Sequence, residues 1–184
     1  MALVYLPHPT DVWSAVEIIR VEDEGKRFFV RRCAVGTDGT DGTEEEVSLS
    51  KEDRAMLERV VGRSAPSALP LVNVGNIGKV DNLVDLNFLH EPAILYALRE
   101  RFMCQQPYTR TGNIVVAVNP YQWIENLYSE ALGLRYLRRE LQSADTSQHG
   151  DLRPHVYFIS SRAFAGMVGS SNSQSILVSG ESGA

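Results

Sequence analysis

The sequence predicts a small all-β barrel followed by an incomplete α/β unit. Short strand-like segments separated by turn signals fill most of the first 50 residues, which is typical of a small barrel. Beyond residue 80, helical patterns alternate with apolar strand patterns, as in an α/β sheet. A connector rich in Pro and Gly lies between the two parts. We therefore place one domain at 1–61, a connector at 62–80 and a second domain at 81–184.

Composition excludes several classes of protein. The net charge of −5 argues against a general nucleic-acid binder, which would carry a basic face. No stretch approaches the roughly 20 apolar residues of a membrane span, and the first residues lack the basic region of a secretory signal. Cys33 and Cys104 lie far apart in the sequence and form neither a metal-ligand spacing nor a disulfide framework. We expect a cytoplasmic protein with reduced thiols, no membrane span and no nucleic-acid partner.

The barrel is predicted from three strands and a helix. Partial alternation favours strands at 12–21 and 26–35, and a third strand at 45–50. The acidic Gly-Thr-Asp repeat at 36–46 is expected to be a solvated loop, because Asp-Gly pairs form turns. It lacks the residue spacing of a Ca²⁺-binding loop. A short helix is predicted at 51–61.

The second part contains the α/β elements. Pro92 favours a helix start near residue 91, where its missing N–H does no harm. Leu95, Leu98 and Phe102 recur at helical spacing and are expected to form its apolar face. The remaining elements are a turn at 109–113, a strand covered on both faces at 114–118, a helix at 129–142 with Ser129 as N-cap, a helix at 153–168 and a strand at 175–179.

The last strand runs into a small-residue turn, "GESGA". Gly180, Glu181, Ser182, Gly183 and Ala184 match the first five positions of the phosphate-binding pattern G-x-x-x-x-G-K-[ST]. Glycines permit the backbone angles with which such a loop turns its N–H groups toward an anion. The final Gly, Lys and Ser or Thr of the pattern would fall beyond Ala184. A strand followed by a glycine turn is also common without any ligand, so this half-motif alone leaves both interpretations open.

Four segments, taken together, resemble one family. They are "LNFLHEPAILYALRERF", "YTRTGNIVVAVNPY", "RPHVYFIS" and "SQSILVSGESGA", and they occur in the order found in myosin motor heads. The resemblance is strong over 81–184. It is weaker over 10–50, which is similar to the small barrel that precedes many myosin motors. It implies a Src-homology-type barrel followed by the first part of a P-loop NTPase motor domain with an incomplete central sheet.

The resemblance assigns an ATP site in two halves. Asn119, Pro120, Tyr121 and Tyr128 match the loop that holds the purine, whereas Gly180, Glu181, Ser182, Gly183 and Ala184 match the start of the phosphate loop. Asn-Pro after a strand is also an ordinary turn starter. The spacing from Asn119 to Tyr128 is one residue longer than is common in the family. ATP and Mg²⁺ are the implied cofactors.

The implied full-length protein is an actin-activated ATPase that moves on actin filaments. Its implied partners are actin and light chains or calmodulin, and its implied location is the cytoskeleton. The Lys and hydroxyl that would contact phosphate and Mg²⁺ are not among the 184 residues, so we expect no ATP hydrolysis by this piece and no cooperative folding of 81–184 alone. Two alternatives stay open: a different P-loop NTPase, or a non-catalytic interaction protein made of a barrel and a truncated motor remnant.

Overall fold

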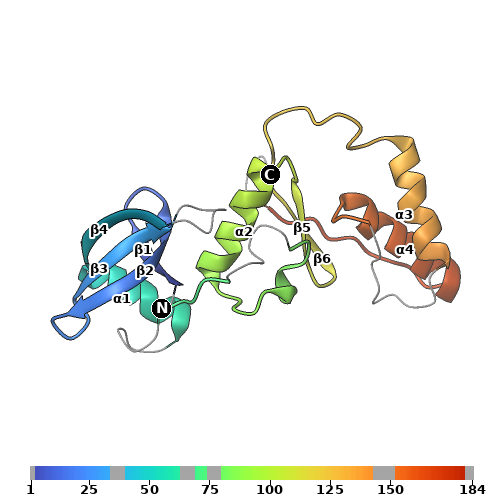
Figure 1. The fold of residues 1–184 in the computed structure, drawn as a ribbon. Helices are drawn as coiled ribbons and strands as arrows, with labels where there is room; N and C mark the ends of the chain where they lie inside the picture. The colour runs from blue at the N-terminus through green and yellow to red at the C-terminus, as the bar shows by residue number, and fades with distance from the viewer. Residues whose placement is uncertain (1–2, 34–39, 63–68, 74–79, 143–151, 181–184) are drawn as a thin grey trace. The chain divides into compact units, whose positions relative to one another are not determined.

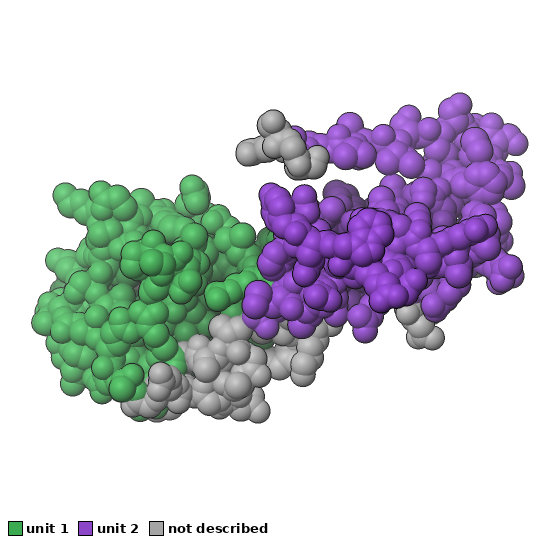
Figure 2. Space-filling view, turned by 90° about the horizontal axis from the view of Figure 1, so that it is seen from above, with its two compact units in different colours: residues 1–80, 85–99 green, residues 81–84, 100–184 purple. Residues whose placement is uncertain are grey.

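The computed structural model divides the chain into two compact units (Figure 2). Unit 1 comprises Met1–Val80 and Asp85–Arg99, and unit 2 comprises Asp81–Val84 and Glu100–Ala184. The residues that the structure describes are 3–33, 40–62, 69–73, 80–142 and 152–180. The side chains at 33 and 40–42, including the predicted thiol of Cys33, lie outside this description.

Unit 1 is built on a four-stranded antiparallel sheet in the order β1-β2-β3-β4 (Figure 1). The strands are β1 Leu3–His8, β2 Val12–Glu22, β3 Arg27–Cys33 and β4 Thr40–Ser48. The three predicted strands are confirmed as β2, β3 and β4, although β4 begins and ends earlier than expected. β1 was not predicted. Its Pro7 suits an edge strand, where a missing N–H costs no ladder hydrogen bond.

The predicted closed barrel is not found in the described part of unit 1. The four strands pair in sequence order, and β1 and β4 do not pair with each other in the described residues. The outer side of β1 contacts residues 70–72: the Tyr5 N–H donates to the Pro70 carbonyl at 2.8 Å, and the Val72 N–H donates to the Leu3 carbonyl at 2.9 Å. Register shifts between Ile18 and Arg20 and between Arg31 and Cys33 mark irregularities in the ladder. Such bulges increase the local twist. The four strands therefore do not close into a barrel within the described residues.

The core of unit 1 lies between this sheet and α1 (Lys51–Val61). Ser50 caps the helix as expected for a capping box: its hydroxyl accepts from the Asp53 N–H, and the Asp53 carboxylate accepts from the Ser50 N–H. Leu57 is fully buried on the inner face of α1, and Phe28 and Val30 are buried on β3. The predicted helix at 51–61 is confirmed.

A second helix, α2 (Glu91–Met103), confirms the expected start at Pro92 but not the expected apolar face. Its buried positions are Pro92, Ala93, Ala97 and Arg101, whereas Leu95 is 45% exposed. The prediction was wrong because small side chains, which allow close packing, were not counted as the apolar face. His90 caps this helix: its Nδ1 accepts from the Ala93 N–H at 3.2 Å, and its Nε2 lies 2.9 Å from the Leu71 carbonyl.

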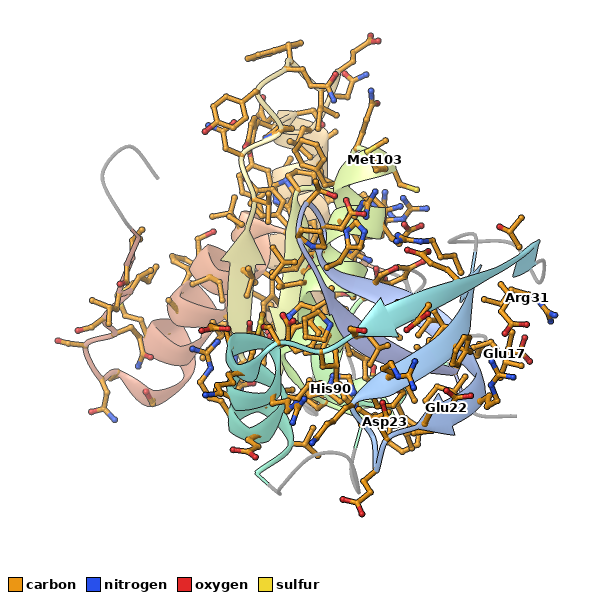
Figure 3. The ribbon with its side chains drawn as sticks, turned by 90° about the vertical axis from the view of Figure 1, so that its left-hand side faces the viewer. Glu17, Glu22, Asp23, Arg31, His90 and Met103 are labelled. Atoms are coloured by element: carbon orange, nitrogen blue, oxygen red, sulfur yellow. The ribbon has the colours of Figure 1, made fainter. Side chains whose placement is uncertain are left out.

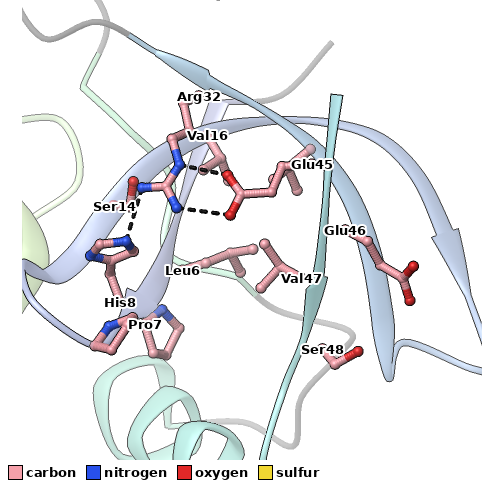
Figure 4. A pocket seen from close by; sticks show the side chains of 12 residues that line it. Leu6, Pro7, His8, Ser14, Val16, Arg32, Glu45, Glu46, Val47 and Ser48 are labelled. Atoms are coloured by element: carbon pink, nitrogen blue, oxygen red, sulfur yellow. Dashed lines mark hydrogen bonds and ion pairs between the residues drawn. The ribbon is translucent and has the colours of Figure 1, made fainter. Parts of the chain in front are cut away.

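Ion pairs connect the outer positions of the sheet. Arg31 donates to Glu17 at 3.2 Å (Figure 3). Arg32 forms a bidentate pair with Glu45, at 2.6 and 2.9 Å, beside a shallow pocket floored by Leu6 and Val16 (Figure 4). This pair raises the pKa of Arg32 and lowers the pKa of Glu45 through their hydrogen bonds. The acidic residues of β4 are thus partly neutralised by arginines of β3.

Unit 2 contains a two-stranded hairpin and two longer helices. Its elements are β5 Tyr108–Thr111, β6 Ile114–Ala117, α3 Glu130–Gln142 and α4 Val156–Ser170, and the short 3₁₀ turn η1 Leu83–Asp85 begins in it. The helices α3 and α4 contact each other. Both predicted helices are confirmed, and Ser129 accepts from the Leu132 N–H as the predicted N-cap.

Two predictions for the hairpin need correction. The predicted turn at 109–113 is mostly strand β5, and only Gly112 and Asn113 form the connection. Gly112 has φ +61°, which favours glycine. The strand at 114–118 is confirmed as β6, but Ile114 is 65% exposed, so β6 is not covered on both faces within the described residues. None of the described helices is both long and apolar enough to cross a membrane.

Candidate functional site

The first half of the candidate site follows directly from β6. The Val118 N–H donates to the Pro107 carbonyl at 2.8 Å, which continues the hairpin by one residue. Asn119 then turns the chain, since its Oδ1 accepts from the Tyr121 N–H at 2.9 Å. This Asx turn holds Tyr121 at φ +50°. The predicted residues Asn119, Pro120 and Tyr121 therefore form one ordered turn at the end of a strand.

The segment after this turn exposes two aromatic side chains. Tyr121 is 89% exposed and Trp123 is 87% exposed. Large aromatic side chains are seldom left this open. Their flat faces provide apolar area for a planar ring, with hydrogen-bonding groups of Asn119 close by in the sequence. The residues present are thus compatible with binding a purine.

The end of the segment is anchored by three hydrogen bonds. The Tyr128 hydroxyl lies 2.6 Å from the Tyr108 hydroxyl on β5. The Tyr128 carbonyl accepts from the Tyr157 hydroxyl at 3.0 Å, and the Leu127 carbonyl lies 2.9 Å from Nε2 of His155. Burial and the hydrogen bond to Tyr128 raise the pKa of Tyr108. Residues 119–128 are therefore held at both ends, by the hairpin and by the start of α4.

His155 is the centre of this anchor. Its side chain is 3% exposed, and four tyrosine rings lie within 5.8 Å of its ring centroid: Tyr108, Tyr128, Tyr136 and Tyr157. Nδ1 accepts from the Tyr157 N–H at 3.0 Å and caps α4. Nε2 must donate, because a carbonyl only accepts. The ring is thus neutral, in agreement with a pKa lowered by burial.

A buried arginine also holds the β5–β6 hairpin in place. Arg101 is 2% exposed, and its guanidinium donates to Thr109 Oγ1 at 2.9 Å, to the Tyr108 carbonyl at 2.8 Å and to the Asp81 carboxylate at 2.7 Å. Asn82 adds a hydrogen bond from the Gly112 N–H to its Oδ1 at 2.9 Å. These contacts fix residues 81–82 and the hairpin that carries the candidate site.

The second half of the candidate site is only partly described. Residues 171–180 form no strand in the structure, which corrects the prediction of a strand at 175–179. Leu177 is 91% exposed and Val178 is 86% exposed, and the segment stands out from the rest of unit 2 (Figure 2). Gly180 is exposed. Glu181, Ser182, Gly183 and Ala184 lie outside the described residues.

The structure brings together some of the predicted residues but not both halves. Hydrogen bonds connect Asn119 with Tyr121, and Tyr128 with Tyr108. No hydrogen bond joins 119–128 to Gly180 in the part of the chain that the structure describes. Across the same described part, no group of three His, Cys, Asp or Glu side chains is arranged to hold a metal.

His155 was not among the residues that the sequence predicted for the site. One local signal was available: His155 directly precedes a helix, and a residue there whose side chain can accept a hydrogen bond caps it. The contact of His155 with Leu127 joins positions 28 residues apart. No local pattern could have revealed it.

Comparison with known proteins identifies the family. Residues 80–184 match the myosin head (motor domain). Myosin-1 of Saccharomyces cerevisiae is 34% identical over 180 residues, covering 93% of this chain and 9% of that protein. Unconventional myosin-Vc of Homo sapiens is 33% identical over 185 residues, covering 98% of this chain and 9% of that protein. Myosin-13 of Arabidopsis thaliana is 41% identical over 105 residues, covering 57% of this chain and 6% of that protein.

The chain thus spans less than a tenth of the length of these relatives. Two of them match nearly all of it, so the similarity includes the sheet of unit 1 as well as unit 2. The match also decides between a myosin and another phosphate-loop protein. The chain belongs to the myosin family, and its residues 80–184 belong to the myosin motor head.

Proposed function

We propose that the protein containing this chain is an ATP-driven motor that acts on actin filaments. One structural observation carries the nucleotide part: residues 119–128 are anchored at both ends while the aromatic faces of Tyr121 and Trp123 stay open. A pre-formed segment of this kind is ready to receive a ring without an ordering cost. Family membership supports the motor part.

The two halves of the site would have different tasks. Asn119, Pro120, Tyr121 and Tyr128 would hold the purine end of ATP. Gly180, Glu181, Ser182, Gly183 and Ala184 would begin the loop whose backbone N–H groups bind the phosphates. ATP supplies the phosphoryl group, and Mg²⁺ neutralises charge on its phosphates. The 184 residues alone would position part of the nucleotide and would not hydrolyse it, because the Lys and hydroxyl of the loop are not among them.

The wider setting follows from the same proposal. Actin would be the track, and light chains or calmodulin would be further partners through regions outside these residues. The protein would then act in the cytoplasm, associated with the cytoskeleton. Unit 1 would accompany the motor, as the near full-length similarity to two myosins indicates.

The first experiment determines what the same transcript encodes after Ala184. A continuation into Gly-Lys-Thr or Gly-Lys-Ser would complete the phosphate loop. A stop codon at that point would overturn the proposed ATPase, since the loop could not reach a nucleotide phosphate with a lysine. The non-catalytic interaction protein would then become the function to test.

A second experiment tests the purine segment in the full-length protein of that transcript. We expect Asn119→Ala to weaken ATP binding about tenfold and to leave tripolyphosphate binding unchanged, because only ATP carries a purine. Asn87→Ala, an exposed Asn-to-Ala change in unit 1, is the matched control. Trp123 offers a direct signal: Trp123→Phe should reduce the change in fluorescence that ATP causes, whereas Trp13→Phe should not, because Trp13 is buried in unit 1. Equal losses for both ligands would contradict the assignment.

Actin binding is tested separately by co-sedimentation of the full-length protein with actin filaments. We expect the protein to sediment with actin and ATP to release it. If ATP binds but actin does not, the nucleotide site stands and the motor proposal fails.

A further inference from the structure

Unit 2 contains a cavity of about 290 Å³ at the end of α2 and the starts of α3 and α4. Its cationic lining comes from Arg101, Arg135 and Arg153, and its aromatic lining comes from Tyr108, Tyr136 and His155. No Asp or Glu lines it. This is an unusual composition for a chain whose net charge is −5. The cavity is separate from the exposed faces of Tyr121 and Trp123, which do not line it.

The charge of this lining is compensated only in part by the described residues. Arg101 is paired with Asp81 at 2.7 Å. The guanidinium groups of Arg135 and Arg153 form no ion pair or hydrogen bond with any residue in the described ranges. His155 adds no charge, because both of its ring nitrogens are used in hydrogen bonds that require the neutral ring. Two positive charges therefore remain at the cavity.

The frame around these two arginines is ordered. The Tyr136 hydroxyl donates to the Arg153 carbonyl, so α3 holds the backbone that carries one guanidinium. Tyr136 itself is 4% exposed. Arg135 is the neighbour of Tyr136 on the same helix. Both guanidinium groups thus extend from backbone that α3 forms or holds, which lowers the cost of ordering them around a ligand.

The size and chemistry of the cavity select a ligand class. A volume of about 290 Å³ lies at the lower end of small-molecule sites, so it suits a small ion better than a nucleotide. Guanidinium groups match oxyanions through paired N–H donors. Tyr136 and His155 are buried on one side of the cavity, whereas Arg135 and Arg153 are exposed and can be reached by an ion from solvent. We propose that this cavity binds a small doubly charged oxyanion, held by Arg135 and Arg153.

The doubly charged oxyanion could be inorganic phosphate or a small dicarboxylate, and binding measurements distinguish the two. The test is calorimetric titration of the 184-residue chain with phosphate and, separately, with malonate, at constant ionic strength. We expect one site per chain, and weaker binding of acetate, which carries a single charge. Tighter binding of phosphate than malonate would identify a phosphate site, and the reverse order a dicarboxylate site.

Substitutions then locate the ion. We expect Arg135→Gln and Arg153→Gln each to weaken binding about tenfold, because each removes a charge-assisted contact. Arg138→Gln is the matched control, since Arg138 is exposed on the same helix and does not line the cavity. Arg135→Lys should lose less affinity than Arg135→Gln, because it keeps the charge. Near-UV circular dichroism checks that each variant keeps its fold.

Proton NMR gives a readout that does not depend on substitution. The ring signals of His155 should shift on saturation with the anion, whereas those of His90 in unit 1 should not. The proposal is overturned if neither anion saturates below about 10 mM, if Arg138→Gln weakens binding as much as Arg135→Gln, or if the His155 signals stay unchanged at saturation. The two proposals are told apart by their ligands, because phosphate and malonate carry no purine and Tyr121 and Trp123 do not line the cavity.

Discussion

Units 1 and 2 differ in how far they cover their apolar residues. In unit 1, Phe28, Val30 and Leu57 are at most 1% exposed. In unit 2, several large apolar side chains remain open: Ile114, Met167, Val168, Ile176, Leu177 and Val178. Contiguous exposed apolar surface usually marks a place that other protein covers. Unit 1 also has exposed large apolar side chains, such as Val12 and Leu89, but among its described residues none is more than 51% exposed. The comparison teaches that the most open apolar surfaces lie in unit 2, on strand and helix surfaces suited to further packing.

The largest expected effect is on the free energy of unfolding, and it comes from a substitution in the core of unit 1. Phe28→Ala should lower the free energy of unfolding by about 3–5 kcal/mol, because it removes a fully buried ring and leaves a cavity. Leu177→Ala should change it by less than about 0.5 kcal/mol, because that side chain is 91% exposed. Chemical denaturation of the 184-residue chain measures both. A large cost for Leu177→Ala would mean that residues 171–180 are covered in solution.

A smaller effect is expected at the buried arginine of unit 2. Arg101→Met should destabilise the contact between residues 81–82 and the hairpin by about 2 kcal/mol, since it removes three hydrogen bonds while the partner Asp81 stays 43% exposed and can be hydrated. Hydrogen exchange at the amides of Arg110 and Gly112 measures this directly, because they donate to Asp81 and Asn82.

The control for this prediction is Arg99→Met on the same helix, because Arg99 is exposed. Its exchange pattern should match that of the unchanged chain. If the amides of Arg110 and Gly112 exchange no faster in Arg101→Met, then the hairpin is held mainly by its own strand pairing and by α4.

The same contrast explains which elements the sequence could predict. Helices with local signals were predicted correctly: Pro92 lies at the start of α2, and Ser129 caps the start of α3. The helix at 51–61 was also predicted, and the structure shows that Ser50 and Asp53 cap it. Strand β5 was taken for a turn, because Thr-Arg-Thr carries no apolar run and becomes a strand only through pairing with β6. The strand at 175–179 shows the reverse: its apolar residues favour a strand, but no partner strand lies beside it within the described residues.

The candidate site also contains residues that the sequence could assign and contacts that it could not. Asn119 and Pro120 were assigned through motif resemblance, and the Asx turn gives that assignment a local structure. The contacts of Tyr128 and Arg101 could not be predicted, because their partners lie 20 residues away in the sequence. The roles of Gly180, Glu181, Ser182, Gly183 and Ala184 stay predictions.

In both units a histidine caps the start of a helix and contacts a backbone carbonyl. The two histidines can therefore be compared directly. His90 caps α2 and contacts the Leu71 carbonyl, whereas His155 caps α4 and contacts the Leu127 carbonyl. Burial lowers the pKa of each ring below its ordinary value. Each ring also touches tyrosine, with Tyr5 next to His90 in unit 1 and four tyrosines around His155.

The smallest expected effect is therefore on the stability of unit 2 in mild acid, and it does not arise at neutral pH. A histidine with a lowered pKa in the folded state is protonated more readily in the unfolded chain, so its stabilising contribution is complete above the unfolded pKa of about 6.5 and is lost as the pH falls below it. We expect unit 2 to become less stable between pH 7.5 and 5.5, as measured by hydrogen exchange at the α4 amides. His155→Asn keeps a side chain that can cap the helix but removes the titrating ring, so it should flatten this dependence in unit 2 and leave that of unit 1 unchanged. A pH dependence that persists in His155→Asn would place the acid sensitivity of unit 2 outside the anchor of residues 119–128.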